Sequence, residues 1–138
     1  VVTAYSSLAQ RLSGRIVLDV QSHGEAWYIH PKNLRRYYLG RPDDAYALMR
    51  LLSLGITNEN LAKIPVTGNG GSIPPDMVKN VSGYILLQVE AHGEAWYVDP
   101  LSLKRQYMAN GADAFNIMRS LGLGITRADL DQIPIGSL

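Results

Sequence analysis

Apolar and polar residues alternate in two short stretches that lie far apart in the chain. The apolar positions recur after the same interval: Ile16, Leu18 and Val20, then Ile85, Leu87 and Val89. Alternation with a period of two is typical of a half-buried β-strand. We therefore expect a strand at 15–22 and its match in the second stretch, with these side chains on the buried face.

Two further short segments follow each alternating stretch. Residues 25–30 and 94–99 are rich in aromatic side chains and run up to a proline, and residues 35–39 and 104–108 come shortly after it. Parallel neighbours in a sheet need a long crossover between them. Three strands this closely spaced are therefore expected to form an antiparallel meander.

A helical period of apolar residues comes after the third strand. Positions i, i+3, i+4 and i+7 are apolar in both stretches: Ala45, Leu48, Met49 and Leu52, then Ala114, Ile117, Met118 and Leu121. This stripe is the core face of an amphipathic helix. A shorter helix is expected before the first strand, at 3–12 and 75–81. Another is expected after Gly55 and Gly124, which end the long helix, with a threonine as its N-cap.

These elements belong to a tandem duplication. Residues 23–28 (HGEAWY) return as residues 92–97, an offset of 69 positions (92 − 23), and about half of the paired positions between 12–65 and 81–134 are identical. We predict an α+β fold with two domains, 1–65 and 73–138, joined by a glycine-rich linker at 66–72. Each has a short helix, a three-stranded antiparallel meander and two C-terminal helices. Because a unit of about 60 residues is marginally stable alone, the two copies are expected to pack on each other.

Composition narrows the functional classes. With 13 basic and 12 acidic residues the net charge is +1, which is too balanced for nucleic-acid binding, and no apolar run is long enough for membrane insertion. There is no cysteine, so disulfides and thiolate metal sites are excluded. The chain opens on Val1 as if in mid-sequence, and we expect it to be part of a larger parent protein.

The repeated string places a histidine, a glutamate and a tryptophan at alternate positions: His23, Glu25 and Trp27, then His92, Glu94 and Trp96. A His–Glu pair on one face of a strand can ligate a metal or act as an acid–base pair. A catalytic metal site needs a third protein ligand, and none recurs in both copies, since His30 is replaced by Asp99. Turn geometry and a hydrogen bond explain the pattern better.

Aromatic and arginine side chains are the other candidates for ligand contacts. The aromatic group is Trp27, Tyr28, Tyr37 and Tyr38 in the first copy and Trp96, Tyr97 and Tyr107 in the second. Such rings stack on sugars or peptides, or fill the space between sheet and helix. We expect the tryptophans in the core and Tyr37, which becomes Gln106, at the surface. Arginines retained in both copies (Arg36 and Arg50, Arg105 and Arg119) are expected to make ion pairs or carbonyl contacts within their own unit, with a carboxylate- or phosphate-binding fork as the alternative.

Three blocks of the sequence carry a resemblance. They are GEAWY[IV]xP, then RxY[LM], then GRPxDA[YF]xxMRxLxLGIT, and together they resemble an uncharacterised tandem repeat module of bacterial extracytoplasmic and surface proteins. Such modules occur in small-genome candidate-phylum bacteria, often beside cell-wall-associated domains. The resemblance covers nearly all of each repeat and implies a secreted or cell-surface accessory module. The second repeat departs from it at Gln106 and at 109–111, so if those positions carry ligand contacts only the first copy is competent.

The leading prediction is a non-enzymatic binding or assembly module of a secreted or cell-surface bacterial protein, with a glycan, a cell-wall polymer or a protein as partner. Its predicted ligand-binding residues are His23, Glu25, Trp27, Arg36, Tyr37, Tyr38, His92, Glu94, Trp96, Arg105 and Tyr107. Two weak sites on one chain gain by avidity. No catalytic residue, metal or cofactor is expected. Two alternatives stay open: a metal-dependent protein or hydrolase that uses His23/Glu25 and His92/Glu94, and a structural spacer without a ligand.

Overall fold

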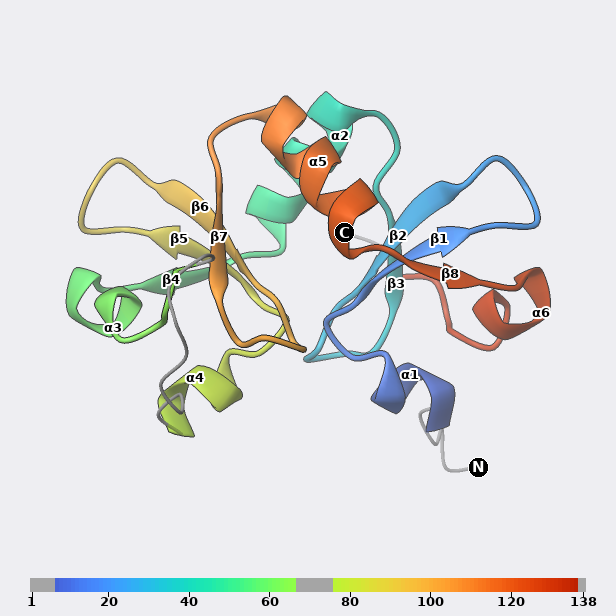
Figure 1. Ribbon diagram of the computed structural model, residues 1–138, viewed down its shortest axis with the longest axis horizontal. Helices are drawn as coiled ribbons and strands as arrows, with labels where there is room; N and C mark the ends of the chain where they lie inside the picture. Colours follow the sequence, from blue (N-terminus) through green and yellow to red (C-terminus); the bar gives the residue numbers. More distant parts are fainter. Residues whose placement is uncertain (1–6, 67–75, 137–138) are drawn as a thin grey trace.

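The computed structural model describes residues 7–66 and 76–136 (Figure 1). Apart from Val66, the expected linker at 66–72 lies outside the described residues. The first repeat forms α1 (Ser7–Arg11), β1 (Ile16–Asp19), β2 (Glu25–Ile29), β3 (Arg36–Tyr38), α2 (Pro42–Leu51), β4 (Leu54–Ile56) and α3 (Asn58–Ala62). The second forms α4 (Asp76–Asn80), β5 (Ile85–Gln88), β6 (Glu94–Val98), β7 (Arg105–Met108), α5 (Gly111–Leu121), β8 (Leu123–Ile125) and α6 (Arg127–Leu130).

The α+β fold with two similar halves is confirmed. β1, β2 and β3 form an antiparallel meander, and β5, β6 and β7 form another. The helix starts also follow the expected chemistry. Thr57 and Thr126 accept hydrogen bonds from the backbone N–H groups of Asn60 and Asp129, and Asn110 caps α5 in the same way.

Each sheet has a fourth strand that the sequence pattern does not predict. β4 and β8 are three residues long, and both contain the glycine taken above as a helix end. Three residues are too few to show a period of two. The long helices in fact end earlier, with Leu52 as the C-cap of α2 and Gly122 as that of α5.

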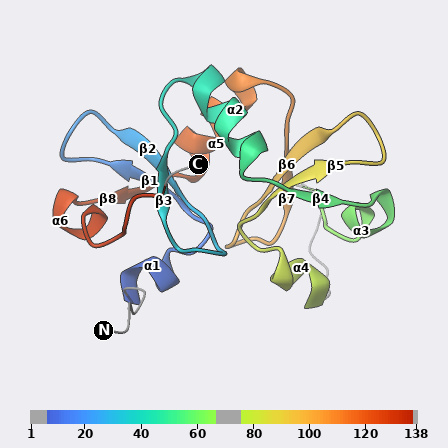
Figure 2. The same ribbon diagram turned by 180° about the vertical axis from the view of Figure 1, so that it is seen from behind.

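The fourth strand of each sheet comes from the other repeat. β8 pairs in parallel with β1, and β4 pairs in parallel with β5, so the strand orders are β3-β2-β1-β8 and β4-β5-β6-β7. Figure 1 shows β8, near the red end of the colour range, beside the blue β1, and the view from behind in Figure 2 shows the same pairing. The two sheets therefore do not coincide with the sequence repeats 1–65 and 73–138.

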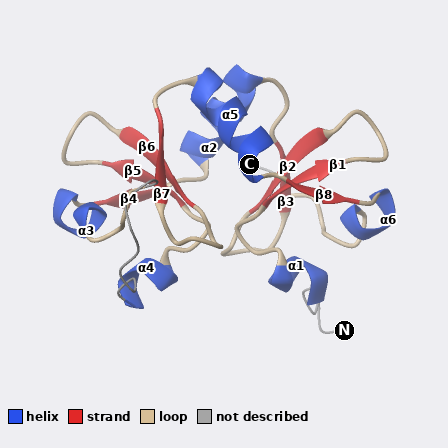
Figure 3. Cartoon of the chain, viewed as in Figure 1, coloured by secondary structure: helices blue, strands red, loops and turns tan. Residues whose placement is uncertain are grey.

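The exchange creates one core between the sheets and two smaller ones outside them. The inward faces and the helices α2 and α5 form a central cluster that includes Tyr28, Met49, Tyr97 and Met118. Figure 3 shows α2 and α5 side by side between the two halves, with α6 and α3 at the outer ends. The outward face of the first sheet packs on α1 and on α6, and that of the second packs on α4 and on α3. Val20 and Val89, expected on the buried face, are instead exposed (59% and 60%), because β1 and β5 end before them.

The backbones of the two halves approach each other closely at a pair of glycines. Gly14 and Gly83 have φ of +76° and +77°, and a Cβ atom on either would lie 2.5 Å from the Cα of the other. The buried hydroxyl of Tyr28 donates to the Gly83 carbonyl and that of Tyr97 to the Gly14 carbonyl, both at 2.6 Å. Burial raises the pKa of both phenols, so they remain protonated donors.

Three of the four repeated arginines donate to carbonyl groups of the other repeat, which corrects the expectation that they act within their own unit, whereas Arg119 lies over the ring of Phe115 in its own helix. Arg50 donates a hydrogen bond at 2.8 Å to the carbonyl of Gly93, which lies in the turn between β5 and β6 of the other repeat. Arg36 donates to the Ile133 carbonyl at 2.8 Å, and Arg105 to the Ile64 carbonyl at 2.9 Å. Sequence shows which residues recur but not which copy they contact.

Replacing Gly14 by alanine is expected to destabilise the chain far more than replacing Gly24. Both glycines have a φ of +76°, so each substitution carries a left-handed penalty of about 1–2 kcal/mol. The methyl group at Gly24 would meet only the end of the Arg119 side chain at 3.4 Å, whereas that at Gly14 would strike the Gly83 backbone. We expect Gly14→Ala to cost a further 1–3 kcal/mol or so in urea unfolding. Equal destabilisation by the two variants would contradict this close approach.

Candidate functional site

The outward face of the first sheet carries most of the predicted site residues of the first copy. Strand alternation places Asp19 of β1, Glu25 and Trp27 of β2, and Arg36 and Tyr38 of β3 on this face. Asp19 lies opposite Glu25, and Trp27 lies opposite Tyr38. The strand register therefore brings these five side chains together on one face of the sheet.

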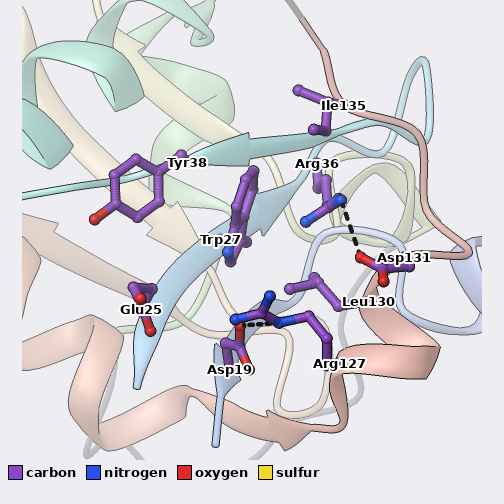
Figure 4. A pocket seen from close by; sticks show the side chains of 9 residues that line it. All are labelled: Asp19, Glu25, Trp27, Arg36, Tyr38, Arg127, Leu130, Asp131 and Ile135. Atoms are coloured by element: carbon purple, nitrogen blue, oxygen red, sulfur yellow. Dashed lines mark hydrogen bonds and ion pairs between the residues drawn. The ribbon is translucent and has the colours of Figure 1, made fainter. Parts of the chain in front are cut away.

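These side chains line a cavity of about 400 Å³ (Figure 4), together with residues that follow β8 in the second repeat. The full lining is Asp19, Glu25, Trp27, Arg36, Tyr38, Arg127, Leu130, Asp131 and Ile135. Because the last four come from the other repeat, neither repeat builds this cavity alone.

Trp27 lies between an aromatic and a cationic neighbour, as Figure 4 shows. The ring centroids of Trp27 and Tyr38 are 5.2 Å apart, and the guanidinium carbon of Arg36 lies 4.3 Å from the Trp27 ring centre. Arg36 is itself fixed by Ile133 and lies 3.7 Å from Asp131. Burial lowers the pKa of Arg36 and Asp131 opposes that shift, but an arginine stays charged at neutral pH. The Trp27 ring, packed between Tyr38 and Arg36, forms part of the cavity lining.

Asp19 is the most deeply buried charged residue of this face, with 3% of its surface exposed. Its Oδ2 accepts a hydrogen bond from Arg127 Nε at 2.9 Å. Its Oδ1 is buried and has no hydrogen-bond donor among the described residues. A buried carboxylate oxygen left without a donor is costly, which makes Asp19 a candidate contact for a ligand.

The repeated His–Glu pair organises a turn. Glu25 Oε1 accepts the His23 backbone N–H at 2.8 Å, and Glu94 does the same for His92 at 2.8 Å. These backbone donors, with the N–H of each glutamate itself first, lower the pKa of both carboxyl groups. The histidine side chains are 93% and 95% exposed, and the described residues hold no group of three metal-ligating side chains.

The structure separates the predicted site residues into groups. Glu25, Trp27, Arg36 and Tyr38 line the cavity, whereas His23 lies outside it on the turn. The second-copy residues Glu94, Trp96, Arg105 and Tyr107 occupy the equivalent face of the second sheet, with Trp96 and Tyr107 centroids 5.1 Å apart, and His92 lies on its turn.

The structure corrects the predicted position of Tyr37. We expected it at the surface, but it is buried (6% exposed) because it alternates with Tyr38 and faces inward. Its hydroxyl accepts a hydrogen bond from Asn33 at 2.7 Å. It therefore contributes nothing to the outward cavity.

Sequence reasoning missed Asp19, Arg127 and Asp131. A signal existed, since the duplication places Gln88, Asn58 and Ala62 at the matching positions, so a charged residue in one copy is neutral in the other. That Asp19 meets Arg127, 108 positions away, depends on the strand exchange and is invisible in the sequence.

A second cavity of about 250 Å³ lies between the repeats and contains His30, Leu52 and Tyr84 in its lining. His30 is 9% exposed; its Nδ1 accepts the Lys32 backbone N–H at 3.0 Å, so Nε2 carries the proton and faces the Leu52 carbonyl at 3.3 Å. Burial lowers the pKa of His30, with a smaller contribution from Lys32. Protonation would also remove the acceptor that Lys32 uses.

Comparison of the chain with protein-family models, with curated proteins and with solved structures finds no match. No helix within 7–66 or 76–136 has the length and apolar character needed to cross a bilayer. The function must therefore be argued from the geometry of the site.

His30 predicts a pH dependence of stability. Because its folded-state pKa lies below the ordinary value of 6.5, the unfolded chain binds a proton that the folded chain does not. Stability should therefore fall as the pH drops below about 6.5, and this part of the fall should stop below the folded-state pKa. Urea unfolding at about pH 7.5 and 5.5 measures it, with His30→Gln as the variant expected to lose this dependence. The lowered carboxyl pKa values of Glu25 and Glu94 affect the free energy of unfolding only at more acidic pH. An identical pH profile in the variant would contradict the assignment to His30.

Proposed function

We propose that this chain is a non-enzymatic glycan-binding module of a secreted or cell-surface bacterial protein. The observation that carries the proposal is the cavity on the outward face of the first sheet, where Trp27 and Tyr38 adjoin a buried, incompletely bonded carboxylate at Asp19. The extracytoplasmic setting rests on the sequence resemblance alone.

The lining favours a sugar over other ligands. Saccharides present apolar ring faces and many hydroxyl groups, and they are held by aromatic side chains together with charged hydrogen-bonding groups. A volume of about 400 Å³ is within the usual range for small-ligand sites and suits one or two sugar rings better than a protein surface.

The charges of the cavity disfavour an anionic wall polymer. Its lining contains three carboxylates (Asp19, Glu25 and Asp131) and two guanidinium groups (Arg36 and Arg127). The balance is negative by one charge, and both cations already face carboxylates. A neutral or amine-bearing sugar fits this field better than a phosphate-rich polymer.

Binding is favoured over hydrolysis by the state of the carboxylates. A glycosidase acid needs a raised pKa so that it holds a proton near neutral pH. Backbone hydrogen bonds lower the pKa of Glu25 instead, and Asp19 is engaged by Arg127. Glu25 and Asp19 therefore suit the acceptance of hydrogen bonds from a ligand better than the donation of a proton to a leaving group.

Titration of the intact chain with neutral hexose, N-acetylhexosamine and hexosamine oligosaccharides tests the proposal. We expect binding to at least one of them, weakened about tenfold or more by Trp27→Ala, since removal of an aromatic anchor typically has an effect of this size. Tyr37→Phe, on the opposite face, should leave the affinity unchanged. The proposal is wrong if no saccharide binds, if Trp27→Ala has no effect, or if new reducing ends appear during incubation.

A further inference from the structure

The outward faces of the two sheets derive from the same repeat but end in different hydrogen-bond networks. The aromatic pair, the arginine over the tryptophan and the turn glutamate are present on both faces. The positions around them differ: Asp19 is matched by Gln88, and Arg127 by Asn58. These replacements change which groups are left for a ligand.

On the second face the polar groups satisfy one another. Gln88 donates from Nε2 to Asn58 Oδ1 at 2.8 Å, and its Oε1 accepts the indole N–H of Trp96 at 3.3 Å. Both ends of the Gln88 amide are used inside the protein. The tryptophan N–H is used as well.

On the first face the matching positions form fewer hydrogen bonds with one another. Asp19 accepts from Arg127 through Oδ2 only, and Oδ1 has no donor within the described part of the chain. Gln88 accepts the indole N–H of Trp96, but among the described residues its counterpart Asp19 accepts no hydrogen bond from the indole N–H of Trp27. Two residues that line the cavity, Asp19 and Trp27, therefore each keep a polar atom without a hydrogen-bond partner among the described residues.

We propose that the first outward face is the single saccharide site of this chain, and that a sugar hydroxyl or amine donates to Oδ1 of Asp19. This inference rests on the proposed function and specifies which face carries it and through which atom. On the second face, Gln88, Asn58 and the indole N–H of Trp96 bond to one another instead. The duplication thus produces two similar outward faces, of which one binds a saccharide.

Access to Asp19 involves the second repeat. The Asp19 side chain is 5% exposed, whereas that of Arg127, whose Nε lies 2.9 Å from Asp19 Oδ2, is 55% exposed. A sugar reaches Oδ1 when the Arg127 guanidinium turns outward, and α6 carries this residue across from the other repeat. The proposed access to Asp19 therefore depends on a residue of the exchanged segment.

The two tryptophans allow each face to be observed separately. The chain contains Trp27 and Trp96 only, so a ¹H–¹⁵N spectrum shows two indole peaks, and Trp96→Phe identifies which is which. The probe is the saccharide that binds the intact chain, or, if several bind, chitosan oligosaccharide, whose amine and hydroxyl groups are both donors. We expect titration to move the Trp27 peak and to leave the Trp96 peak in place, with one ligand bound per chain.

Two variants at Asp19 test the role of its Oδ1 atom, and a third variant tests the second face. Asp19→Gln with Arg127→Asn copies the network of the second face, and we expect it to lower the affinity at least tenfold while both indole peaks stay dispersed. Asp19→Asn, which keeps the size of the side chain, serves if the double variant unfolds, and it should also lower the affinity because an amide nitrogen can occupy the position of the acceptor. The reverse change, Gln88→Asp with Asn58→Arg, should make the Trp96 peak respond to the saccharide.

The outcomes separate the two proposals. Absence of binding to the intact chain overturns the proposed function. Binding that shifts both indole peaks, that shifts only the Trp96 peak, or that survives both Asp19 variants overturns the single-site inference and leaves the glycan-binding function standing.

Discussion

The exchange of the last strand and helix between the repeats is the constraint on which the rest of the structure depends. α2 packs against α5 in the central core, and only Leu52 and Ser53 separate α2 from β4. Two extended residues span about 7 Å, so the chain enters β4 close to the end of α2. There β4 adds to the sheet of the other repeat, and β8 does the same in reverse. Neither half is complete without the other.

This constraint explains features that are otherwise unrelated. Gly14 and Gly83 must be glycines because the two halves meet at their Cα atoms, and the phenol groups of Tyr28 and Tyr97 bridge the same contact. The arginines of each meander reach carbonyl groups of the other repeat. The cavity beside Trp27 exists because α6 is brought over the outward face of the first sheet. Fold and candidate site thus share one cause.

Local patterns predicted the local structure well and the long-range structure poorly. The meanders, the amphipathic helices and the threonine caps depend on residues a few positions apart, and the sequence contains their periods directly. β4 and β8 are too short for a period and are defined by partners in the other repeat. Trp27, Tyr38 and Arg36 could be selected from the sequence because their residue types suggest binding. Asp19 and Arg127 could not be selected from the sequence, because they become neighbours only when the strand exchange brings Arg127 Nε to 2.9 Å from Asp19 Oδ2. The replacement of Tyr37 by Gln106 in the second copy indicates an exposed position, but alternation with Tyr38 along β3 places Tyr37 inward.

Nuclear Overhauser contacts between β1 and its fourth-strand neighbour test the exchange most directly. Leu18 is paired with Gly124, whereas a repeat that completed its own sheet would pair Leu18 with Gly55, the equivalent glycine of the first copy. In a monomeric sample we predict contacts between the protons of Leu18 and Gly124, and between those of Leu87 and Gly55. Contacts of Leu18 with Gly55 in their place would show that each repeat folds on itself, and would contradict the account given for both the fold and the site.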